Sequence, residues 1–268
     1  MKRRDFSGFV AQNWKKYIMV IILVLIQCRF FEIGVEQYAQ IKNTEYKLSV
    51  SDYVIEFFKS TLPYTFSGKK EAFNIPPILS LYVIYYFVLI GKSVSDLSTP
   101  FQIQCTLRRG SRKRWWYRQS LNIWLETIGY LFITFLTFLV YGICSGARFS
   151  WNNVKLHLEY NGMDTSKFAI IPNIILTSLF ILTALAYIQY VISLRGNVFL
   201  GIVISTIIWI CSVFHWNPLL LGNYLMVRRY EPILEGGANC MTGIGMSAGI
   251  ILLMFLAGCY ITKTKDLF

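Results

Sequence analysis

The sequence predicts an all-α integral membrane protein, and three observations lead to this fold class. Hydrophobic residues make up 55% of the 268 residues and charged residues only 15%, whereas an average soluble domain carries about 25% charged residues. The chain contains several uncharged apolar runs close to the length of about 20 residues that a transmembrane helix needs. These runs are continuous rather than alternating in polarity, which favours helices over a membrane β-barrel.

Six membrane spans can be drawn, and we expect them to form one domain over residues 1–268. The long apolar region near the amino terminus is followed by no small-residue cleavage pattern, so we interpret it as a retained span rather than a signal peptide. Span two is short, but Pro76 and Pro77 suit its first turn, and Lys92 can extend its ammonium group to the interface. The predicted spans are 17–35, 75–90, 121–144, 168–194, 198–214 and 244–262.

The distribution of Lys and Arg predicts the orientation of the chain. With the amino terminus inside, the inner segments hold 15 basic and three acidic residues, whereas the outer loops hold ten basic and nine acidic ones. Because Lys and Arg concentrate in cytoplasmic loops, we expect a multi-pass plasma-membrane protein with both termini in the cytoplasm. The same rule explains the net charge of +12, so nucleic acid is not expected as a partner.

Three segments outside the spans have recognisable patterns. Residues 1–16 place Phe6, Phe9, Val10 and Trp14 on one helical face among basic residues, which predicts an interfacial amphipathic helix, with a frayed tail as the alternative. The stretch SVSDYVIEFFKSTL has a capping pattern and helical apolar spacing, which predicts a short outer helix. The apolar start of NPLLLGNYLMVRRYEPILEGG can dip into the outer leaflet as a re-entrant or interfacial helix.

The sequence contains no recognisable motif for catalysis or metal binding. GKS at positions 91–93 resembles the end of a phosphate-binding loop, but Tyr86 stands where that loop needs its first glycine, and a membrane span precedes it. His157 and His215 lie in different outer segments. The six cysteines form no C-x-x-C pair and are interpreted as small hydrophobic side chains. We therefore expect no enzyme activity and no cofactor on this chain.

Polar and aromatic residues within the spans have competing interpretations. Glu126 lies about one turn into span three, where a carboxylate marks a cavity, a proton path or a buried partner, unless it is solvated near the inner face or paired with an arginine. Arg29 and Glu32 are three residues apart and are expected to form a local ion pair. Several aromatic residues either line a cargo pathway or pack between helices. These are Tyr82, Tyr85 and Tyr86 on span two, and Trp124 and Tyr130 on span three.

Small residues on the last two spans allow helices to approach closely. Gly245 and Gly249 are four residues apart in span six, and Gly201 and Ser205 repeat this spacing more weakly in span five. We expect both pairs to pack against other helices of the same chain, with a seam between two chains as the alternative.

The stretch LRRGSRKRWW, residues 107–116, lies on the inner side between spans two and three. The inner loop around it, 93–118, is too long for a simple turn and predicts a helix, a break at Gly110–Ser111 and the entry to span three. Basic residues next to a span attract anionic lipid, each worth about 1 kcal/mol, and Trp115 and Trp116 suit the membrane interface. A docking element for a cytosolic protein has the same composition, so both interpretations stay open.

This organisation resembles the permease subunits of ABC-2-type exporters, and the resemblance covers most of the chain. The six spans, the amino-terminal interfacial helix, the long inner loop and the re-entrant-like segment all match this plan. The most specific part is DLSTPFQIQCTLRRGSRKRWWYRQSL, which is similar to a stretch containing G-S-R-x-x-W in small Gram-positive permeases of this type. FNIPPILSLYVIYYF and NPLLLGNYLMVRRYE are similar to segments flanking the corresponding spans, whereas Pro100 stands near where the family has glycine.

The resemblance implies a permease that pairs with a second permease chain, identical or different, while each chain docks a separate cytosolic ATPase that binds ATP and Mg²⁺. It implies a coupling helix from Leu97 to Leu107 and a second ATPase contact at the turn from Leu194 to Asn197. The residues implied in ATPase coupling are Asp96, Leu97, Phe101, Leu107, Arg108, Arg109, Arg112, Trp115 and Arg195.

The resemblance also implies a Gram-positive source and export of an amphipathic antimicrobial or toxin peptide. The residues expected along the cargo pathway are Tyr82, Tyr85, Tyr86, Glu126 and Tyr130. An exporter of a lipid or drug-like molecule with the same architecture, an ion-coupled secondary transporter and a non-transporting membrane scaffold are the alternatives.

Overall fold

The computed structural model describes residues 14–64, 75–97, 112–150, 154–165 and 170–264, and within these ranges the regular elements are all helices, joined by loops that contain two isolated β-bridges. Five helices in this part of the chain are long and apolar enough to cross a membrane, so the protein is an all-α membrane protein. They are α2 (Ile18–Lys42), α4 (Pro77–Leu97), α6 (Arg112–Cys144), α8 (Ile170–Arg195) and α10 (Cys240–Thr264). A further apolar helix, α9 (Val198–Phe214), has 17 residues.

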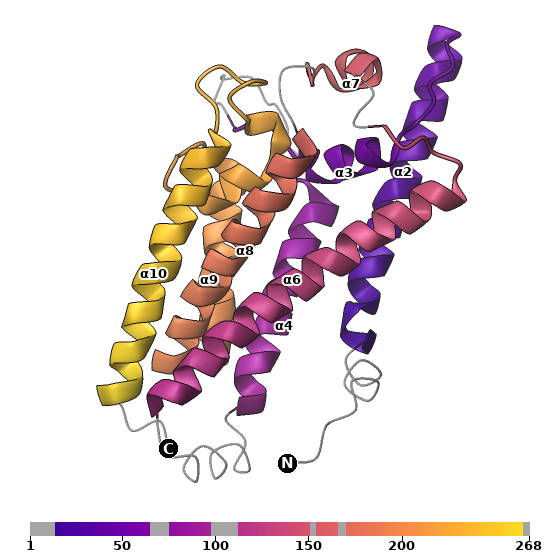
Figure 1. Cartoon of the computed structure of the whole chain (residues 1–268). Coiled ribbons are helices and arrows are strands. Elements are labelled where there is room, and N and C mark those ends of the chain that lie inside the picture. The colour runs from indigo at the N-terminus through magenta and orange to yellow at the C-terminus, as the bar shows by residue number, and fades with distance from the viewer. Residues whose placement is uncertain (1–13, 65–74, 98–111, 151–153, 166–169, 265–268) are drawn as a thin grey trace.

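Successive long helices run in opposite directions. Figure 1 shows α2, α6 and α9 starting at the end of the bundle drawn at the bottom, where α4, α8 and α10 finish. We call this the lower end and the opposite one the upper end. The shorter elements at the upper end are α3 (Val50–Lys59), α7 (Val154–Asn161) and the 3-10 turns η2 (Leu221–Leu225) and η3 (Val227–Arg229), whereas the 3-10 turn η1 (Trp14–Tyr17) leads into α2 at the lower end.

Helix α8 is the centre of the packing, because it contacts α4, α6, α9 and α10 and also reaches α3 and η2. Its buried face includes polar side chains that are satisfied within the bundle. Thr183 donates to the carbonyl oxygen of Leu179 one turn earlier at 2.7 Å, and Gln189 donates to the carbonyl oxygen of Phe87 in α4 at 2.7 Å. The first bond closes within α8, whereas the second holds α8 to α4 where no water is available.

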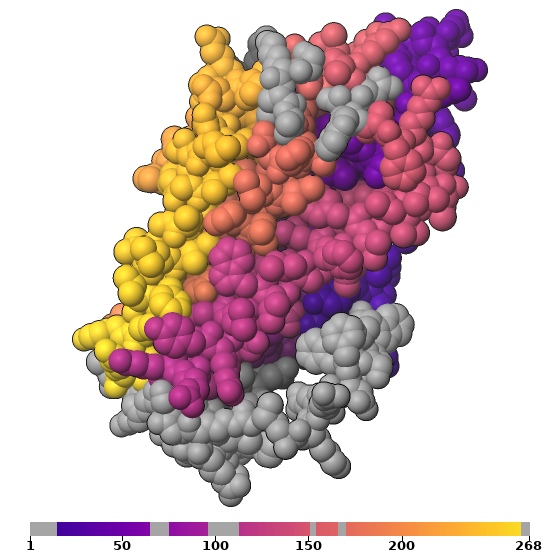
Figure 2. Space-filling view, in the orientation of Figure 1, coloured from indigo at the N-terminus to yellow at the C-terminus, as the bar shows by residue number. Residues whose placement is uncertain are grey.

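Helix α6 runs obliquely across the bundle as one unbroken helix of 33 residues (Figure 1). It contacts α8 and α10 as well as α2 and α3. In the space-filling view it covers the middle of the visible face, with α10 along the edge (Figure 2). One rigid element therefore links the two sides of the bundle.

The first turns of α6 correct the expectation that both tryptophans face lipid. Trp116 is 0% exposed: its indole N–H donates to the carbonyl oxygen of Phe255 in α10 at 3.0 Å, and its ring lies against Tyr187 and Tyr190 of α8. Trp115 is only partly buried. Because consecutive helical residues point about 100° apart, the two indoles cannot share one face, and Trp116 instead joins α6 to α8 and α10.

Gly258 of α10 makes room for this tryptophan. A Cβ atom built on Gly258 would overlap the indole of Trp116, so the two helices approach closely only because position 258 has no side chain.

The other small-residue pairs behave differently from each other. Gly201 of α9 packs directly on Gln189 and Ser193 of α8, which confirms the expected internal contact. By contrast, Gly245 and Gly249 of α10 have no atom within 4 Å of a built Cβ, which contradicts the expectation that they pack inside this chain. They lie on an open face of α10 because Gly243 and Gly258, on its other side, are the residues that approach Tyr224 and Trp116.

The predicted short helix in SVSDYVIEFFKSTL is confirmed as α3. It begins at the expected capping box, in which the backbone N–H of Ser49 donates to the carboxylate of Asp52 at 2.8 Å. The apolar face that the spacing predicted, including Tyr53, Phe57 and Phe58, is buried.

The segment expected to be re-entrant forms two 3-10 turns rather than a helix. η2 and η3 are largely buried, with η2 packed against α8, α9 and α10. Arg229, the last residue of η3, holds this segment in place and is 0% exposed. The guanidinium donates to the carbonyl oxygens of Thr61 (3.0 Å), Ser212 (2.5 Å) and Val213 (2.6 Å), and also to the side chain of Asn223.

Arg229 thereby completes the last turn of α9, whose final carbonyl groups have no partner within the helix. Burial lowers the pKa of Arg229 to about 10, so the side chain stays charged at neutral pH. The charge is favourable at this place because the carboxyl end of a helix carries a partial negative charge.

We expect Gly258→Ala to destabilise the protein by about 1–3 kcal/mol, because the new methyl group overlaps the indole of Trp116. Gly249→Ala, measured on the monomeric chain in detergent, is the matched control, since it adds the same group to the same helix in open space. It should be neutral or stabilise by less than about 1 kcal/mol. Unfolding by sodium dodecyl sulfate, followed by circular dichroism, measures both values. Equal effects of the two substitutions would contradict the packing of α6 on α10.

We expect Arg229→Met to cost about 3 kcal/mol or more, because three carbonyl groups and an amide lose a buried donor. Arg228→Met should cost only about 1 kcal/mol, since the half-buried Arg228 donates one hydrogen bond that the structure records, to the carbonyl oxygen of Asn161. The same unfolding titration compares them, and a smaller loss for the Arg229 variant than for the Arg228 variant would refute the anchoring role.

Candidate functional site

The structure gathers the five predicted pathway residues where the start of α2 meets α4 and α6. Glu126 and Tyr85 lie at the partly accessible edge of this region, and Tyr82, Tyr86 and Tyr130 lie behind them. We call Lys16, Tyr17, Tyr85 and Glu126 the α2–α4–α6 junction.

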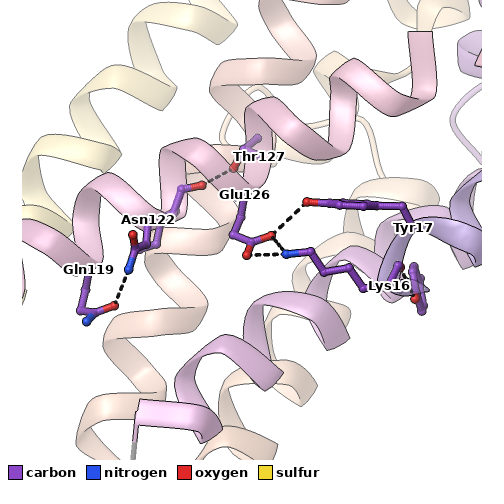
Figure 3. A network of polar contacts seen from close by, with 8 residues as sticks. Lys16, Tyr17, Gln119, Asn122, Glu126 and Thr127 are labelled. Atoms are coloured by element: carbon purple, nitrogen blue, oxygen red, sulfur yellow. Dashed lines mark hydrogen bonds and ion pairs between the residues drawn. The ribbon is translucent and has the colours of Figure 1, made fainter. Parts of the chain in front are cut away.

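An ion pair forms the centre of the junction (Figure 3). The ammonium group of Lys16 donates to both carboxylate oxygens of Glu126, at 2.6 and 2.7 Å, and the hydroxyl group of Tyr17 donates to one of them at 3.3 Å. The side chains of Lys16 and Glu126 are 20% and 26% exposed. Partial shielding from water strengthens such a pair relative to one on an open surface.

The start of α2 is also tied to α4. The hydroxyl group of Tyr85 donates to the backbone carbonyl oxygen of Lys16 at 2.6 Å. The ammonium group of Lys16 lies 5.0 Å from the centre of the Tyr17 ring, which adds a cation–π contact. Two helices therefore fix the point at which the chain enters α2.

Behind the junction, tyrosine and threonine side chains join α4 to α6. The hydroxyl groups of Tyr86 and Thr127 are 2.6 Å apart, and those of Tyr82 and Thr134 are 3.0 Å apart. Tyr130 donates to the backbone carbonyl oxygen of Tyr82 at 2.7 Å, and its ring centre lies 4.7 and 5.0 Å from those of Tyr82 and Tyr86.

These three tyrosines are fully buried, so in this conformation they are packing residues. Their hydroxyl groups are paired across the α4–α6 interface, as hydrogen-bonding groups enclosed in a membrane protein must be. A cargo could touch their rings only if α4 and α6 moved apart. Tyr85 and Glu126 are accessible without such a movement.

Glu126 has a partner that was not considered in the sequence. Because α6 begins at Arg112, Glu126 lies about four turns into the helix. Its partner is Lys16 rather than an arginine. Lys16 stands just before α2, which places the ion pair close to the level at which that helix begins.

The residues implied in ATPase coupling lie at the lower end where the structure describes them. Asp96 and Leu97 end α4, Arg112 begins α6 with Trp115 in its first turn, and Arg195 ends α8 with its side chain exposed. Phe101, Leu107, Arg108 and Arg109, and with them most of the expected coupling helix, lie outside the described residues, as does the expected amino-terminal helix apart from Trp14.

Comparisons with models of known protein families, with curated proteins and with solved structures return no match. The chemistry of the site therefore has to be judged from the residues themselves.

A second polar cluster joins α3 to α7 at the upper end. Nε2 of His157 lies 3.1 Å from Oδ1 of Asp52, and both residues are 0% exposed. The side-chain NH₂ group of Asn161 donates to Nδ1 of His157 at 3.0 Å and to Glu56 at 2.9 Å, and its Oδ1 accepts from Lys59 at 2.8 Å. Because Nδ1 accepts and Nε2 donates, this arrangement suits a neutral histidine.

This Asp–His pair is unsuited to catalysis. A catalytic histidine needs one ring nitrogen directed at a nucleophile or a substrate, and here both nitrogens are used by buried side chains. Among the described residues, no group of three or more His, Cys, Asp or Glu side chains could hold a metal ion. We interpret the cluster as the connection that attaches α7 to α3.

The predicted ion pair between Arg29 and Glu32 is confirmed, with a distance of 3.0 Å. Glu32 also accepts hydrogen bonds of 2.7 Å from Tyr53 of α3 and Tyr141 of α6. Burial raises the pKa of Tyr53, and the carboxylate of Glu32 adds to this shift, so the phenol remains a donor. One carboxylate on α2 thus connects three helices.

Sequence reasoning missed Lys16, Tyr17, Thr127 and Thr134. Two signals were available. Lys16 is a basic residue at the start of span one, which places it at the level of an inner carboxylate. Thr127, Tyr130 and Thr134 follow the 3–4 residue spacing of one helical face. The sequence of α6 alone does not specify which face of α4 these residues contact.

We expect Lys16 and Glu126 to be energetically coupled by about 1 kcal/mol or more in a double-mutant cycle of Lys16→Met and Glu126→Gln. The measurement is the free energy of unfolding in detergent for both single variants and the double variant. Lys155 and Glu159 provide the matched control pair, because they are 4.0 Å apart and 70% and 37% exposed, and should couple by less than about 0.5 kcal/mol. Additive effects at Lys16 and Glu126 would show that the ion pair contributes nothing.

Proposed function

We propose that this chain is the six-span permease subunit of an ATP-driven exporter of the ABC-2 type. In this proposal a cytosolic ATPase docks on the lower end, a second permease chain completes the transport pathway, and the cargo is an amphipathic peptide.

The observation that carries the proposal is the continuity of α6. This helix begins at Arg112, directly after the basic stretch at 107–111, and contacts α10 and α8 as well as α2 and α3. A displacement of its first turn is therefore transmitted along a rigid rod of about 50 Å to the opposite side of the bundle. A transporter driven from a cytosolic partner needs such an element.

The charge of the lower end supports a cytoplasmic orientation. The described basic residues of the predicted inner segments lie near the ends of the long helices there: Lys15, Lys16, Lys92, Arg112, Lys113, Arg114, Arg118, Arg195 and Lys263. This clustering on one side follows the rule for cytoplasmic loops. It also provides cationic groups for acidic lipid and for a docked protein.

Helix α9 is the proposed sixth span. Its 17 residues give a length of about 26 Å, slightly less than the hydrocarbon thickness of about 30 Å. The missing length is compensated at the upper end of α9. There Arg229 completes the last turn of the helix, and the buried turns of η2 cover it with protein.

The mechanism follows from the linkage between ATPase closure and helix position. ATP binding draws the two ATPase subunits together, and the docked segments pull on α4 and α6. The α2–α4–α6 junction ties these helices to the start of α2, so movement of α6 either carries α2 along or breaks the Lys16–Glu126 pair. Cargo is expelled because the two conformations bind it with different affinity.

The open face of α10 is a supporting feature for the second chain. Gly245 and Gly249 leave room for another helix to approach closely. The peptide cargo rests on the resemblance to small Gram-positive permeases. A lipid or drug-like cargo would use the same architecture, whereas an ion-coupled transporter or a scaffold would need no ATPase.

The proposal predicts that the chain, purified from its native membrane, retains an ATPase whose activity depends on it. Replacing Arg108, Arg109 and Arg112 together by Glu should lower the retained ATPase or its stimulation at least about fivefold, because the basic stretch carries the contact. The measurements are co-purification followed by ATP hydrolysis in proteoliposomes.

Lys263→Glu is the control for this experiment, since it reverses a charge on the same side of the membrane at the end of α10. It should leave both quantities within about twofold of the native protein. Recovery of no ATPase with the native chain would refute the exporter and favour an ion-coupled transporter or a scaffold.

A further inference from the structure

A polar cavity of about 910 Å³ opens at the upper end beside α2. One wall is α2 from Arg29 to Gln40, and the facing wall is the returning segment 44–48 together with residues 145–148 after α6. The two parts of this second wall are fixed to each other. The N–H of Arg148 donates to the carbonyl oxygen of Leu48 at 2.9 Å, and the N–H of Val50 donates to that of Arg148 at 3.1 Å.

The cavity lies at the level expected for lipid headgroups. The continuous series of exposed large apolar residues on α2 ends at Ile33, with only Ile41 beyond it, and that on α6 ends at Ile143. The cavity spans this boundary, since its lining starts at Arg29 and Glu32 and extends away from the hydrocarbon through Glu36 and Arg148. The headgroup region adds about 5–8 Å to each side of a bilayer, which is one to two helical turns along α2.

The charges around the cavity are separated by sign. A side extension of about 290 Å³ is bordered by Lys47, Arg148 and Lys155. The wall of α2 carries Glu36 and the ion pair of Arg29 with Glu32, which leaves a negative charge on this wall, and Glu45 lines both regions. The floor is rigid because Glu32 is held by two tyrosine hydroxyl groups and by Arg29.

We propose that this cavity binds a phosphate-bearing zwitterion with a primary ammonium group, which is the headgroup chemistry of phosphatidylethanolamine. The phosphate would lie among Lys47, Arg148 and Lys155, and the ammonium would face Glu36 and Glu45. This proposal does not depend on the exporter function.

Three features favour this ligand over a simple anion or cation. The charged side chains that line the main cavity are balanced, with three basic and three acidic residues, so an ion of a single charge would leave one side uncompensated. Phosphate takes charge-assisted hydrogen bonds from arginine and lysine. A primary ammonium supplies three donors to carboxylates, which the quaternary ammonium of phosphatidylcholine cannot.

The test is native mass spectrometry of the purified full-length chain titrated with phosphatidylethanolamine, phosphatidylglycerol and phosphatidylcholine of identical acyl chains. We expect phosphatidylethanolamine to bind at least about fivefold more tightly than the other two. Equal binding of the three lipids, or no saturable binding of any, would overturn the proposal.

Two variants separate the halves of the site. Lys47→Gln with Arg148→Gln should weaken phosphatidylethanolamine and phosphatidylglycerol alike by about fivefold, because both lipids present a phosphate. Glu36→Gln with Glu45→Gln should retain lipid but abolish the preference for phosphatidylethanolamine. All four side chains are exposed, so folding should be unaffected, and Lys92→Gln at the lower end is the control that should change nothing. An unchanged preference in the Glu36 and Glu45 variant would refute the proposed orientation.

Competition with soluble glycerophosphoethanolamine identifies the source of the ligand. Displacement of phosphatidylethanolamine would show that the headgroup alone is recognised and that a soluble phosphodiester can occupy the cavity. Retention of the lipid would show that a membrane phospholipid is the ligand. The chain for this experiment is expressed by itself, without an ATPase, so its outcome is independent of that of the coupling experiment.

Discussion

Hydrocarbon offers no hydrogen-bond partner, so a polar group inside a membrane bundle gains from being paired within the protein, and the arrangement of these helices depends on several such pairs. Gln189 joins α8 to α4, and the indole of Trp116 joins α6 to α10. The tyrosines of α4 face threonines of α6, and Arg229 closes the end of α9. Apolar contact alone would leave the helices free to slide, because lipid chains are as apolar as leucine. Directional bonds between helices give each pair a defined register.

The same constraint explains which parts of the molecule could be predicted. Span positions depend on local composition, and the predicted limits of 198–214 agree with α9, as the capping box agrees with α3. Glu126 was recognised as unusual, but its partner lies 110 residues away, and only the packing of α2 on α6 brings the two together. Trp115 and Trp116 were treated as one feature because they are adjacent, although a helix directs them to different surroundings. Gly245 and Gly249 have the spacing of a packing motif, but spacing does not specify which face meets a neighbour.

The lower half of the molecule combines a rigid connection with one that can open. Helix α6 is continuous and cannot change length, whereas the Lys16–Glu126 pair is a contact between side chains that water can replace at modest cost. A force applied at the start of α6 would therefore appear as a change at the junction before it disturbed the buried tyrosines. The junction therefore separates more easily than the tyrosine interface. Such a difference suits the proposed transporter, which needs one interface that opens repeatedly and another that stays closed. The polar cavity at the upper end lies apart from this junction, and none of the junction residues lines it.

Arg229 has a consequence for how the protein is made. Helices α8 and α9 are complete as apolar segments once residue 214 has been synthesised, and they can enter the membrane as a hairpin at that stage. The terminal carbonyl groups of α9 receive their hydrogen-bond donor from a guanidinium that lies 15 residues beyond the end of the helix. Until Arg229 arrives, this end of α9 depends on water or lipid headgroups for its hydrogen bonds. The hydrogen bonds at this end of α9 are therefore complete only when the segment after the helix has folded back onto the bundle.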